Sequence, residues 1–295
     1  MDSKNNSSMA DYNKMKYWGQ VDLYDGGMEH ATRHLLYARF WNIFLHEQGL
    51  VPESEPFSKR ISHGMILGPN GEKMSKSKGN VVNPNDMVVE YGADSLRVYE
   101  MFIGDYSKDA AWNENGLKGC HKFLNRIWNL KNKLGDSYGY SKELECIIHK
   151  TIKKVTDDIE SLNYNTAVAA LMILLNEMDK LEVVSRDEYR TILHLLNPFA
   201  PHITEELNSI CDLGKSFSIS VWPSYDDSKT INDQLEIGVQ VNGKVRATIK
   251  VNKDEDKDVV EKVALDQENV KKFTSDKEIV KIIVVPNRIV NIVVK

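Results

Sequence analysis

The stretch Gly71-Glu72-Lys73-Met74-Ser75-Lys76-Ser77-Lys78-Gly79-Asn80 decides which fold this chain of 295 residues is predicted to adopt. It places three lysines, two serines and two glycines within ten residues. A lysine ammonium group is a compact charge that suits phosphate oxygens, and serine hydroxyls and glycine-flanked amides add hydrogen-bond donors. Loops rich in lysine and serine are also common as solvated basic surface, so composition alone leaves both interpretations open. The G-x-x-x-x-G-K-S/T spacing of a P-loop is absent.

Strand and helix signals alternate on both sides of this loop. A strand candidate at Val21-Asp22-Leu23-Tyr24 is followed by Asp25-Gly26-Gly27, and the apolar spacing after it predicts a helix from about residue 29 to 48. Gly64-Met65-Ile66-Leu67 predicts a second buried strand, and residues 83–102 predict two helices broken near Gly92. This alternation predicts that residues 1–105 are part of a nucleotide-binding α/β domain.

Residues 106–222 carry apolar side chains at helical spacing in four segments, which predicts an all-α antiparallel bundle. Asn197-Pro198 and Pro201 are expected to kink or break the fourth segment, residues 187–210. Residues 223–234 are polar and rich in turn formers, which is typical of a linker.

Residues 235–295 change to a strand pattern and predict a small α+β domain. Asn242-Gly243 is a strong hairpin signal between two β-rich runs. A helix is predicted at 256–273, and two closing strands are predicted at 279–285 and 289–294. The fold class expected for the chain is therefore multidomain, α/β followed by all-α and then α+β.

The bulk composition excludes several classes of protein. The formal net charge of −5 argues against a general nucleic-acid coat, which would usually be basic, but leaves room for a local basic face. The three cysteines are far apart and form no C-x-x-C pair, so no metal site is predicted. No stretch reaches the roughly 18 apolar residues that span a bilayer. We expect a soluble, cytoplasmic protein without membrane contact.

The string Lys73-Met74-Ser75-Lys76-Ser77, with the glycine and asparagine that follow, resembles the KMSKS signature of the class I aminoacyl-tRNA synthetases. In that family the loop holds the triphosphate of ATP, which Mg²⁺ accompanies. The resemblance implies that ATP is bound by four side chains of this loop, those of Lys73, Ser75, Lys76 and Ser77. Lys73 and Lys76 would be catalytic, and Lys76 would carry more of the transition-state stabilisation. Charge builds on the α-phosphate and the leaving pyrophosphate, and cations placed beforehand stabilise that charge.

Gly26-Gly27-Met28-Glu29-His30-Ala31 resembles the class I ribose-binding element in its leucyl-tRNA synthetase version. Glycines between a strand and a helix let a ligand approach the backbone, and a glutamate there can accept hydrogen bonds from ribose hydroxyls. A lone helical histidine is ordinarily structural, but the resemblance implies an adenosine pocket lined by Gly26, Gly27, Glu29 and His30. The stretch His63-Gly64-Met65-Ile66-Leu67 resembles the strand before the signature loop, where Met65 and Ile66 would meet the adenine.

The resemblance extends to four later stretches, in the family's order, and so covers nearly the whole chain: residues 91–97, 125–128, 197–203 and 239–246. It implies the carboxy-terminal half of a bacterial-type enzyme. That half comprises the second half of the Rossmann-type catalytic domain, an anticodon-binding-type helical bundle and a small tRNA-binding domain. Arg126, Lys244 and Arg246 are the candidate tRNA contacts, while Trp128 is expected to belong to the core.

Parts of the family pattern are absent from the sequence. It lacks the HIGH signature, the first half of the nucleotide fold, most of the leucine pocket and the editing domain. We therefore expect that the chain alone does not activate leucine. It would be a fragment or subunit that needs an amino-terminal half carrying HIGH, on the same polypeptide or on another chain.

The function that the resemblance implies is that of a component of leucine--tRNA ligase, with leucine, ATP and tRNA(Leu) as its substrates. The alternative is a non-catalytic tRNA-binding module that kept only the bundle and the terminal domain. The intact nucleotide elements favour the ligase, because a pure tRNA-binding module has no reason to keep an adenosine pocket. A general nucleotide-binding α/β protein would leave residues 106–295 unexplained.

Overall fold

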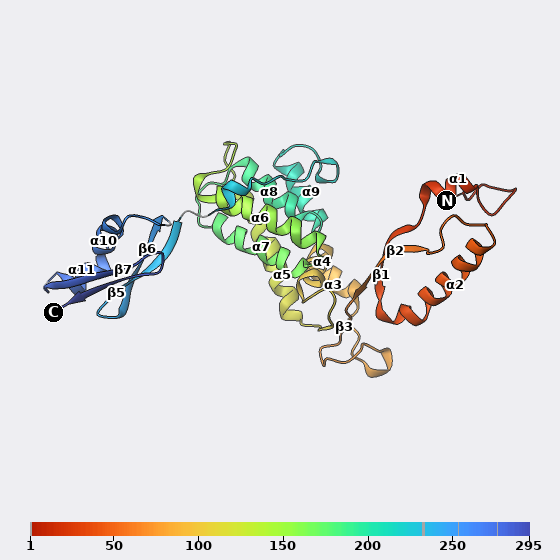
Figure 1. The fold of residues 1–295 in the computed structure, drawn as a ribbon, viewed down its shortest axis with the longest axis horizontal. Coiled ribbons are helices and arrows are strands. Elements are labelled where there is room, and N and C mark those ends of the chain that lie inside the picture. The colour runs from red at the N-terminus through yellow and green to blue at the C-terminus, as the bar shows by residue number, and fades with distance from the viewer. Residues whose placement is uncertain (1, 232–233, 253, 276) are drawn as a thin grey trace. The chain divides into compact units, whose positions relative to one another are not determined.

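The computed structural model describes residues 2–231, 234–252, 254–275 and 277–295. Its elements, drawn in Figure 1, fall into two compact units, one ending at Tyr225 and one beginning at Asp226. The division lies inside the polar stretch 223–234, which offers few apolar side chains for burial. Within the described ranges, no helix is both long and apolar enough to cross a membrane.

Two parallel strands form the amino-terminal α/β part of the first unit. β1 (Val21–Gly27) lies beside β2 (Phe57–His63), with Gly27 opposite His63. The helix α1 (Tyr12–Trp18) precedes β1. The sequence predicts β1 but not β2, because the residues of β2 do not alternate between apolar and polar. β2 is therefore stabilised as a strand by its pairing with β1 and not by its own residue pattern.

The connection from β1 to β2 differs from the single helix predicted at residues 29–48. A 3₁₀ helix, η1 (Met28–Thr32), comes first, and Arg33 (φ −118°, ψ −104°) interrupts the helical path before α2 (His34–Glu47). Neither glycine nor proline marks this break, so the sequence pattern does not reveal it. The helix α2 ends at Glu47, one residue before the predicted end, and Gly49 follows the cap residue with a φ of +71° that suits glycine.

The lysine-rich loop lies between two short parallel strands. β3 (Ile66–Leu67) pairs with β4 (Ala110–Ala111), so the strand predicted at residues 64–67 is shorter than expected. Asn83 caps the helix that follows the loop by accepting the Asn85 N–H at 3.1 Å. The elements between the two strands are η2 (Lys76–Lys78), α3 (Pro84–Tyr91) and α4 (Ala93–Phe102).

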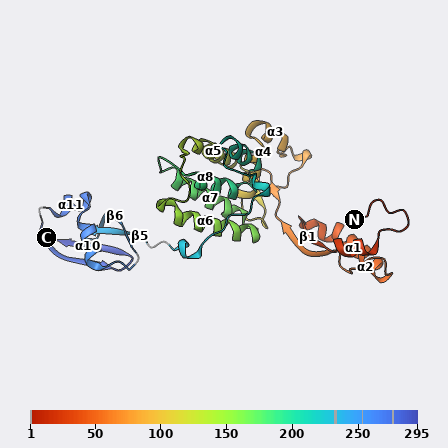
Figure 2. The same cartoon turned by 90° about the horizontal axis from the view of Figure 1, so that it is seen from above.

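Helices from α5 to α9 form a bundle, and α5 to α8 lie side by side in both views (Figures 1 and 2). The fourth predicted segment is broken as expected, because Pro201 has no N–H to continue α8 and instead starts α9. The elements are α5 (Glu114–Leu130), η3 (Lys131–Lys133), α6 (Lys142–Glu160), α7 (Tyr164–Met178), α8 (Arg186–Leu196), α9 (Pro201–Ile210) and η4 (Phe217–Ile219).

The bundle and α4 share one hydrophobic core. Tyr99 of α4 is buried together with Leu171 and Leu175 of α7. A buried carboxylate also joins α6 to α8: Glu188 accepts the N–H and the hydroxyl of Ser141 at 2.7 and 2.6 Å. Helix α4, which follows the lysine-rich loop, is therefore fixed to the bundle.

The second unit is a four-stranded sheet in the order β6-β5-β8-β7, with two helices that supply part of its core. Asn242 and Gly243 both have positive φ, +48° and +78°, as a type I′ hairpin requires. The helix predicted at residues 256–273 is two helices, because Gln267 is extended (φ −66°, ψ 127°). The elements are η5 (Asp227–Thr230), β5 (Gln234–Val241), β6 (Lys244–Asn252), α10 (Lys257–Leu265), α11 (Glu268–Thr274), β7 (Ile279–Val285) and β8 (Ile289–Val294).

Candidate functional site

A single asparagine organises the lysine-rich loop. The Asn80 side chain accepts the Ser75 N–H at 2.8 Å and donates to the carbonyl of Lys73 at 3.3 Å. Gly79 turns the chain back with a φ of +64°. Gly68 leaves room for this contact, because a Cβ there would lie 2.8 Å from Asn80 Nδ2. Sequence reasoning gave Asn80 no role, although it lies only three residues after the signature.

The lysines of the loop are not equivalent. Lys78 Nζ forms an ion pair with Glu72 at 2.9 Å. Lys73 and Lys76 are exposed, and their ammonium groups take part in neither an ion pair nor a hydrogen bond in the described part of the chain. The hydroxyls of Ser75 and Ser77 lie 2.7 Å apart. The loop therefore holds two cations ready for an anionic ligand and a third that is already neutralised.

Gly26, Gly27 and Glu29 lie where β1 ends and η1 begins. The Glu29 carboxylate folds back over Gly27, so a side chain at Gly27 would collide with it. The pKa of Glu29 is held below its usual value, first by a hydrogen bond to its own backbone N–H and then by the charges of His30, Lys73 and Arg33. Lys73 therefore lies within electrostatic range of Glu29, which directly follows the carboxyl end of β1.

His30 brings a buried polar atom to the same strand end. Its Nδ1 is buried and has no hydrogen-bond partner among the described residues. The neighbouring His34, whose ring centroid is 6.4 Å away, is satisfied by a 3.0 Å contact with the Tyr24 hydroxyl. Buried polar atoms without partners are rare in folded proteins and suggest a partner outside the chain.

Met65 and Ile66 differ in which of their backbone groups are free. The Met65 N–H donates to the Asp109 carboxylate at 2.7 Å, and its carbonyl accepts the Ala110 N–H at 3.0 Å. Ile66 lies opposite Ala110 in the same parallel pair, so its own N–H and C=O point to the other edge of the strand. A cavity of about 260 Å³ borders both residues. Backbone contact with a base is therefore available at Ile66 rather than at Met65.

The three candidate tRNA contacts have different surroundings. Arg126 is engaged by α7, with Nη2 2.5 Å from Asp179 and 2.7 Å from Asn176. Lys244 is exposed in the hairpin and has no ion pair among the described residues. The Arg246 guanidinium lies 3.8 Å from the centre of the Phe273 ring. Lys244 is thus the candidate whose charge is freely available to a phosphate.

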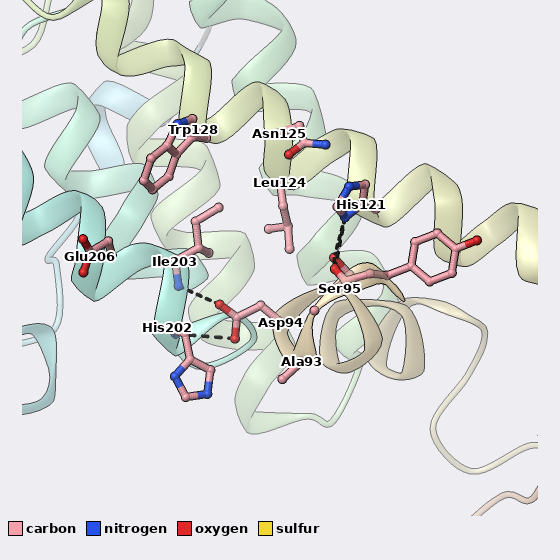
Figure 3. A pocket seen from close by; sticks show the side chains of 12 residues that line it. Ala93, Asp94, Ser95, His121, Leu124, Asn125, Trp128, His202, Ile203 and Glu206 are labelled. Carbon is pink, nitrogen blue, oxygen red and sulfur yellow. Dashed lines mark hydrogen bonds between the residues drawn. The ribbon is translucent and has the colours of Figure 1, made fainter. Parts of the chain in front are cut away.

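Three of the stretches that carry the family resemblance, residues 91–97, 125–128 and 197–203, meet at one surface pocket of about 680 Å³ (Figure 3). Asp94 caps α9 there by accepting the Ile203 N–H at 2.6 Å. Trp128 lines the pocket and packs partly against the core. These stretches lock α4, α5 and α9 together, which gives a structural reason for their residue types.

Comparison with known proteins finds two family models that match successive parts of the chain. Residues 18–113 match the family model described as tRNA synthetases class I (I, L, M and V). Residues 142–261 match the anticodon-binding domain of tRNA ligase. The chain therefore carries a class I synthetase catalytic-type domain followed by an anticodon-binding domain.

Within that class the chain belongs to the leucyl-tRNA synthetase family. It is 52% identical over 261 residues to the leucine--tRNA ligase of Alkaliphilus oremlandii (strain OhILAs). That match covers 88% of this chain but only 32% of the relative, so the chain spans about a third of its length.

Two solved structures share the fold. The crystal structure of the Agrobacterium radiobacter K84 agnB2 LeuRS-tRNA-LeuAMS ternary complex matches with a TM-score of 0.69 and 30% identity. The match covers 97% of this chain and 40% of that one. Mycobacterium tuberculosis methionyl-tRNA synthetase matches with a TM-score of 0.50 and 17% identity, over 67% of this chain and 47% of that one. The second match shows a likeness of fold alone.

Proposed function

We propose that this chain supplies part of the ATP site of a leucine--tRNA ligase, which joins leucine to tRNA(Leu). The observation that carries the proposal is the pair of unpaired cations, Lys73 and Lys76, on a loop whose charge reaches Glu29 at the end of β1. A triphosphate that extends from an adenosine at this strand end would meet both lysines.

ATP fits the groups that lack partners within the chain. The backbone N–H and C=O of Ile66 match the donor and acceptor edge of adenine, and Glu29 can accept ribose hydroxyls. The buried Nδ1 of His30 is also without a partner among the described residues. Mg²⁺ would arrive on the phosphates, since the described residues contain no group of three potential metal ligands.

The chemistry proposed for these residues is electrostatic. The leucine carboxylate attacks the α-phosphate of ATP, a new P–O bond forms, and the bond to pyrophosphate breaks. Lys73 and Lys76 stabilise the charge that grows on the α-phosphate and on the leaving pyrophosphate. The leucyl group of the adenylate then passes to a hydroxyl of tRNA(Leu), and AMP leaves.

We further propose that an amino-terminal half carrying HIGH completes the site. β1 and β2 form a two-stranded parallel sheet, and parallel sheets are normally covered on both faces. Phe40 and Trp41 of α2 are more than half exposed beside it. An additional α/β segment would cover these aromatic side chains and pair with the open strand edge.

ATP–pyrophosphate exchange tests both parts of the proposal. The purified chain should show no leucine-dependent exchange, and addition of a polypeptide that carries the HIGH half should restore it. Exchange by the chain alone would contradict the need for the second half. A reconstituted complex that binds tRNA but never exchanges pyrophosphate would favour the alternative, a non-catalytic tRNA-binding module.

The second unit is proposed to contact tRNA, and removing it gives a direct test. A chain that ends at Tyr225 keeps the whole bundle core and should stay folded. Its affinity for tRNA(Leu) should fall by at least about tenfold, because the contacts made through the hairpin at Lys244 are lost. Filter binding at several salt concentrations measures this.

The full-length chain with Lys244→Ala is the matched variant for that test. Its salt dependence of tRNA binding should drop by roughly one counterion, with the slope changing by about 0.7–0.9. Equal affinity of the chain ending at Tyr225 and the full chain would rule out a tRNA role for the second unit.

A further inference from the structure

A tyrosine from the segment after α4 reaches β1. The Tyr106 hydroxyl donates a short hydrogen bond to Asp25 Oδ2, and Asp25 immediately precedes Gly26 in the strand. Within the described part of the chain, it is the one hydrogen bond that joins residues 2–63 to residues beyond Gly64. Burial first, and then this bond, raises the pKa of Tyr106 above its usual value, so the phenol stays a donor at neutral pH.

The Tyr106 ring connects this hydrogen bond to the bundle. It packs edge-on against Tyr164, the first residue of α7, with ring centroids 5.2 Å apart. The ring of Tyr164 in turn packs against that of Phe199, with centroids 6.2 Å apart, and Phe199 is buried in the bundle core. Aromatic pairs at these distances and angles are favourable contacts. A continuous aromatic path therefore runs from β1 to the core.

The backbone of Tyr106 also makes contacts with the segment that leads into the lysine-rich loop. Its carbonyl accepts the Gly64 N–H at 2.8 Å. Gly64 is required there, because a Cβ would overlap the carbonyl of Lys108. Residues 104–108 thus cross directly over the junction between β2 and β3, which is where the α/β part leads into the lysine-rich loop.

We propose that Asp25 and Tyr106 are positioning residues that hold the carboxyl end of β1 in place against the lysine-rich loop and the first turn of α7. The inference rests on the proposed function, because it is the ATP site whose two sides would be aligned. Without the hydrogen bond, the β1–β2 pair is connected to the remainder mainly through the chain at residues 63–64. Gly26, Gly27 and Glu29 would then lose their fixed distance from Lys73.

Hydrogen exchange, which needs no ligand, tests whether the Tyr106–Asp25 hydrogen bond holds β1 in place. Tyr106→Phe should raise amide exchange in residues 21–27 and leave exchange in α6 unchanged. The matched control is Tyr164→Phe, which keeps the ring and removes a hydroxyl with no hydrogen-bond partner among the described residues. It should behave like the wild-type chain. Unchanged exchange in residues 21–27 of Tyr106→Phe would overturn the inference.

Equilibrium dialysis of radiolabelled ATP with Mg²⁺ on the full chain, combined with a HIGH-containing half, tests the role of Asp25 and Tyr106 in ATP binding. Asp25→Ala and Tyr106→Phe should each weaken ATP binding by about tenfold. The double variant should be little weaker than either single variant, because both remove the same bond. The thermal unfolding of the bundle should not move.

The outcomes separate the two proposals. If the wild-type chain combined with the HIGH-containing half binds no ATP, the proposed function fails, and the positioning role fails with it. If the wild-type chain binds ATP and both variants bind equally well, the proposed function stands and the positioning role is wrong. Additive losses in the double variant would also contradict a shared bond.

Discussion

Lys76→Ala should slow leucine adenylation by about 10²–10³-fold, the usual effect of removing one preorganised donor that faces developing charge. Lys76 is exposed and unpaired among the described residues, so its charge is not spent on a contact within the chain. Its loop is held in shape by Asn80 and not by Lys76, so the substitution should remove a charge and leave the loop conformation intact. The loss should appear in kcat more than in the affinity for tRNA.

The matched control for this prediction is Lys78→Ala. Lys78 lies two residues away on the same loop but is paired with Glu72 at 2.9 Å. Its removal should cost much less adenylation activity, because its charge is already compensated. The measurement is ATP–pyrophosphate exchange by the chain combined with a HIGH-containing half, with tRNA affinity measured in parallel. Equal losses for Lys76→Ala and Lys78→Ala, or a matching loss of tRNA affinity, would show that the loop is a general basic contact.

Much of the fold follows from local pattern. The bundle helices have apolar side chains at helical spacing, and the hairpin at Asn242-Gly243 has the two residues that a type I′ turn prefers. The closing strands at 279–285 and 289–294 have the predicted bounds. Each of these elements is specified by residues adjacent in sequence, so reasoning from the sequence can find it.

Elements that depend on distant partners were not predictable in the same way. β2 forms because β1 lies alongside it, and its own residues show no strand alternation. The interruptions at Arg33 and Gln267 carry no glycine or proline. For β2, pairing with a distant strand decides the local conformation, because strand propensity alone is too weak to do so.

In the candidate site, too, some features follow from the local sequence and others depend on distant partners. The signature loop identifies the lysines, but only the structure distinguishes unpaired Lys73 and Lys76 from paired Lys78. It likewise separates Ile66 from Met65, whose backbone groups are used by Asp109 and Ala110. Whether a backbone or side-chain group of the site is free depends on hydrogen-bond partners outside the motif. The motif alone therefore does not predict it.

Leu171→Ala should destabilise the first unit by about 2–5 kcal/mol, the range for a fully buried leucine replaced by alanine. Leu171 lies on α7 with no exposed surface, inside the core that α4 shares with the bundle. The truncation removes apolar contacts and leaves a cavity that the surrounding helices can only partly fill. Urea unfolding followed by the helical circular-dichroism signal measures the change.

Ile173→Ala is the matched control, since Ile173 lies on the same helix two residues away but is 53% exposed. Its loss should cost within about 0.5 kcal/mol of zero, as is usual for surface positions. Because α4 follows the lysine-rich loop and joins the same core, Leu171→Ala should also weaken ATP binding as the unit loosens, whereas Ile173→Ala should not. A small effect of Leu171→Ala on stability, comparable to that of Ile173→Ala, would contradict the packing of α7. A large loss of stability without any loss of ATP affinity would show that the bundle and the nucleotide site are held independently.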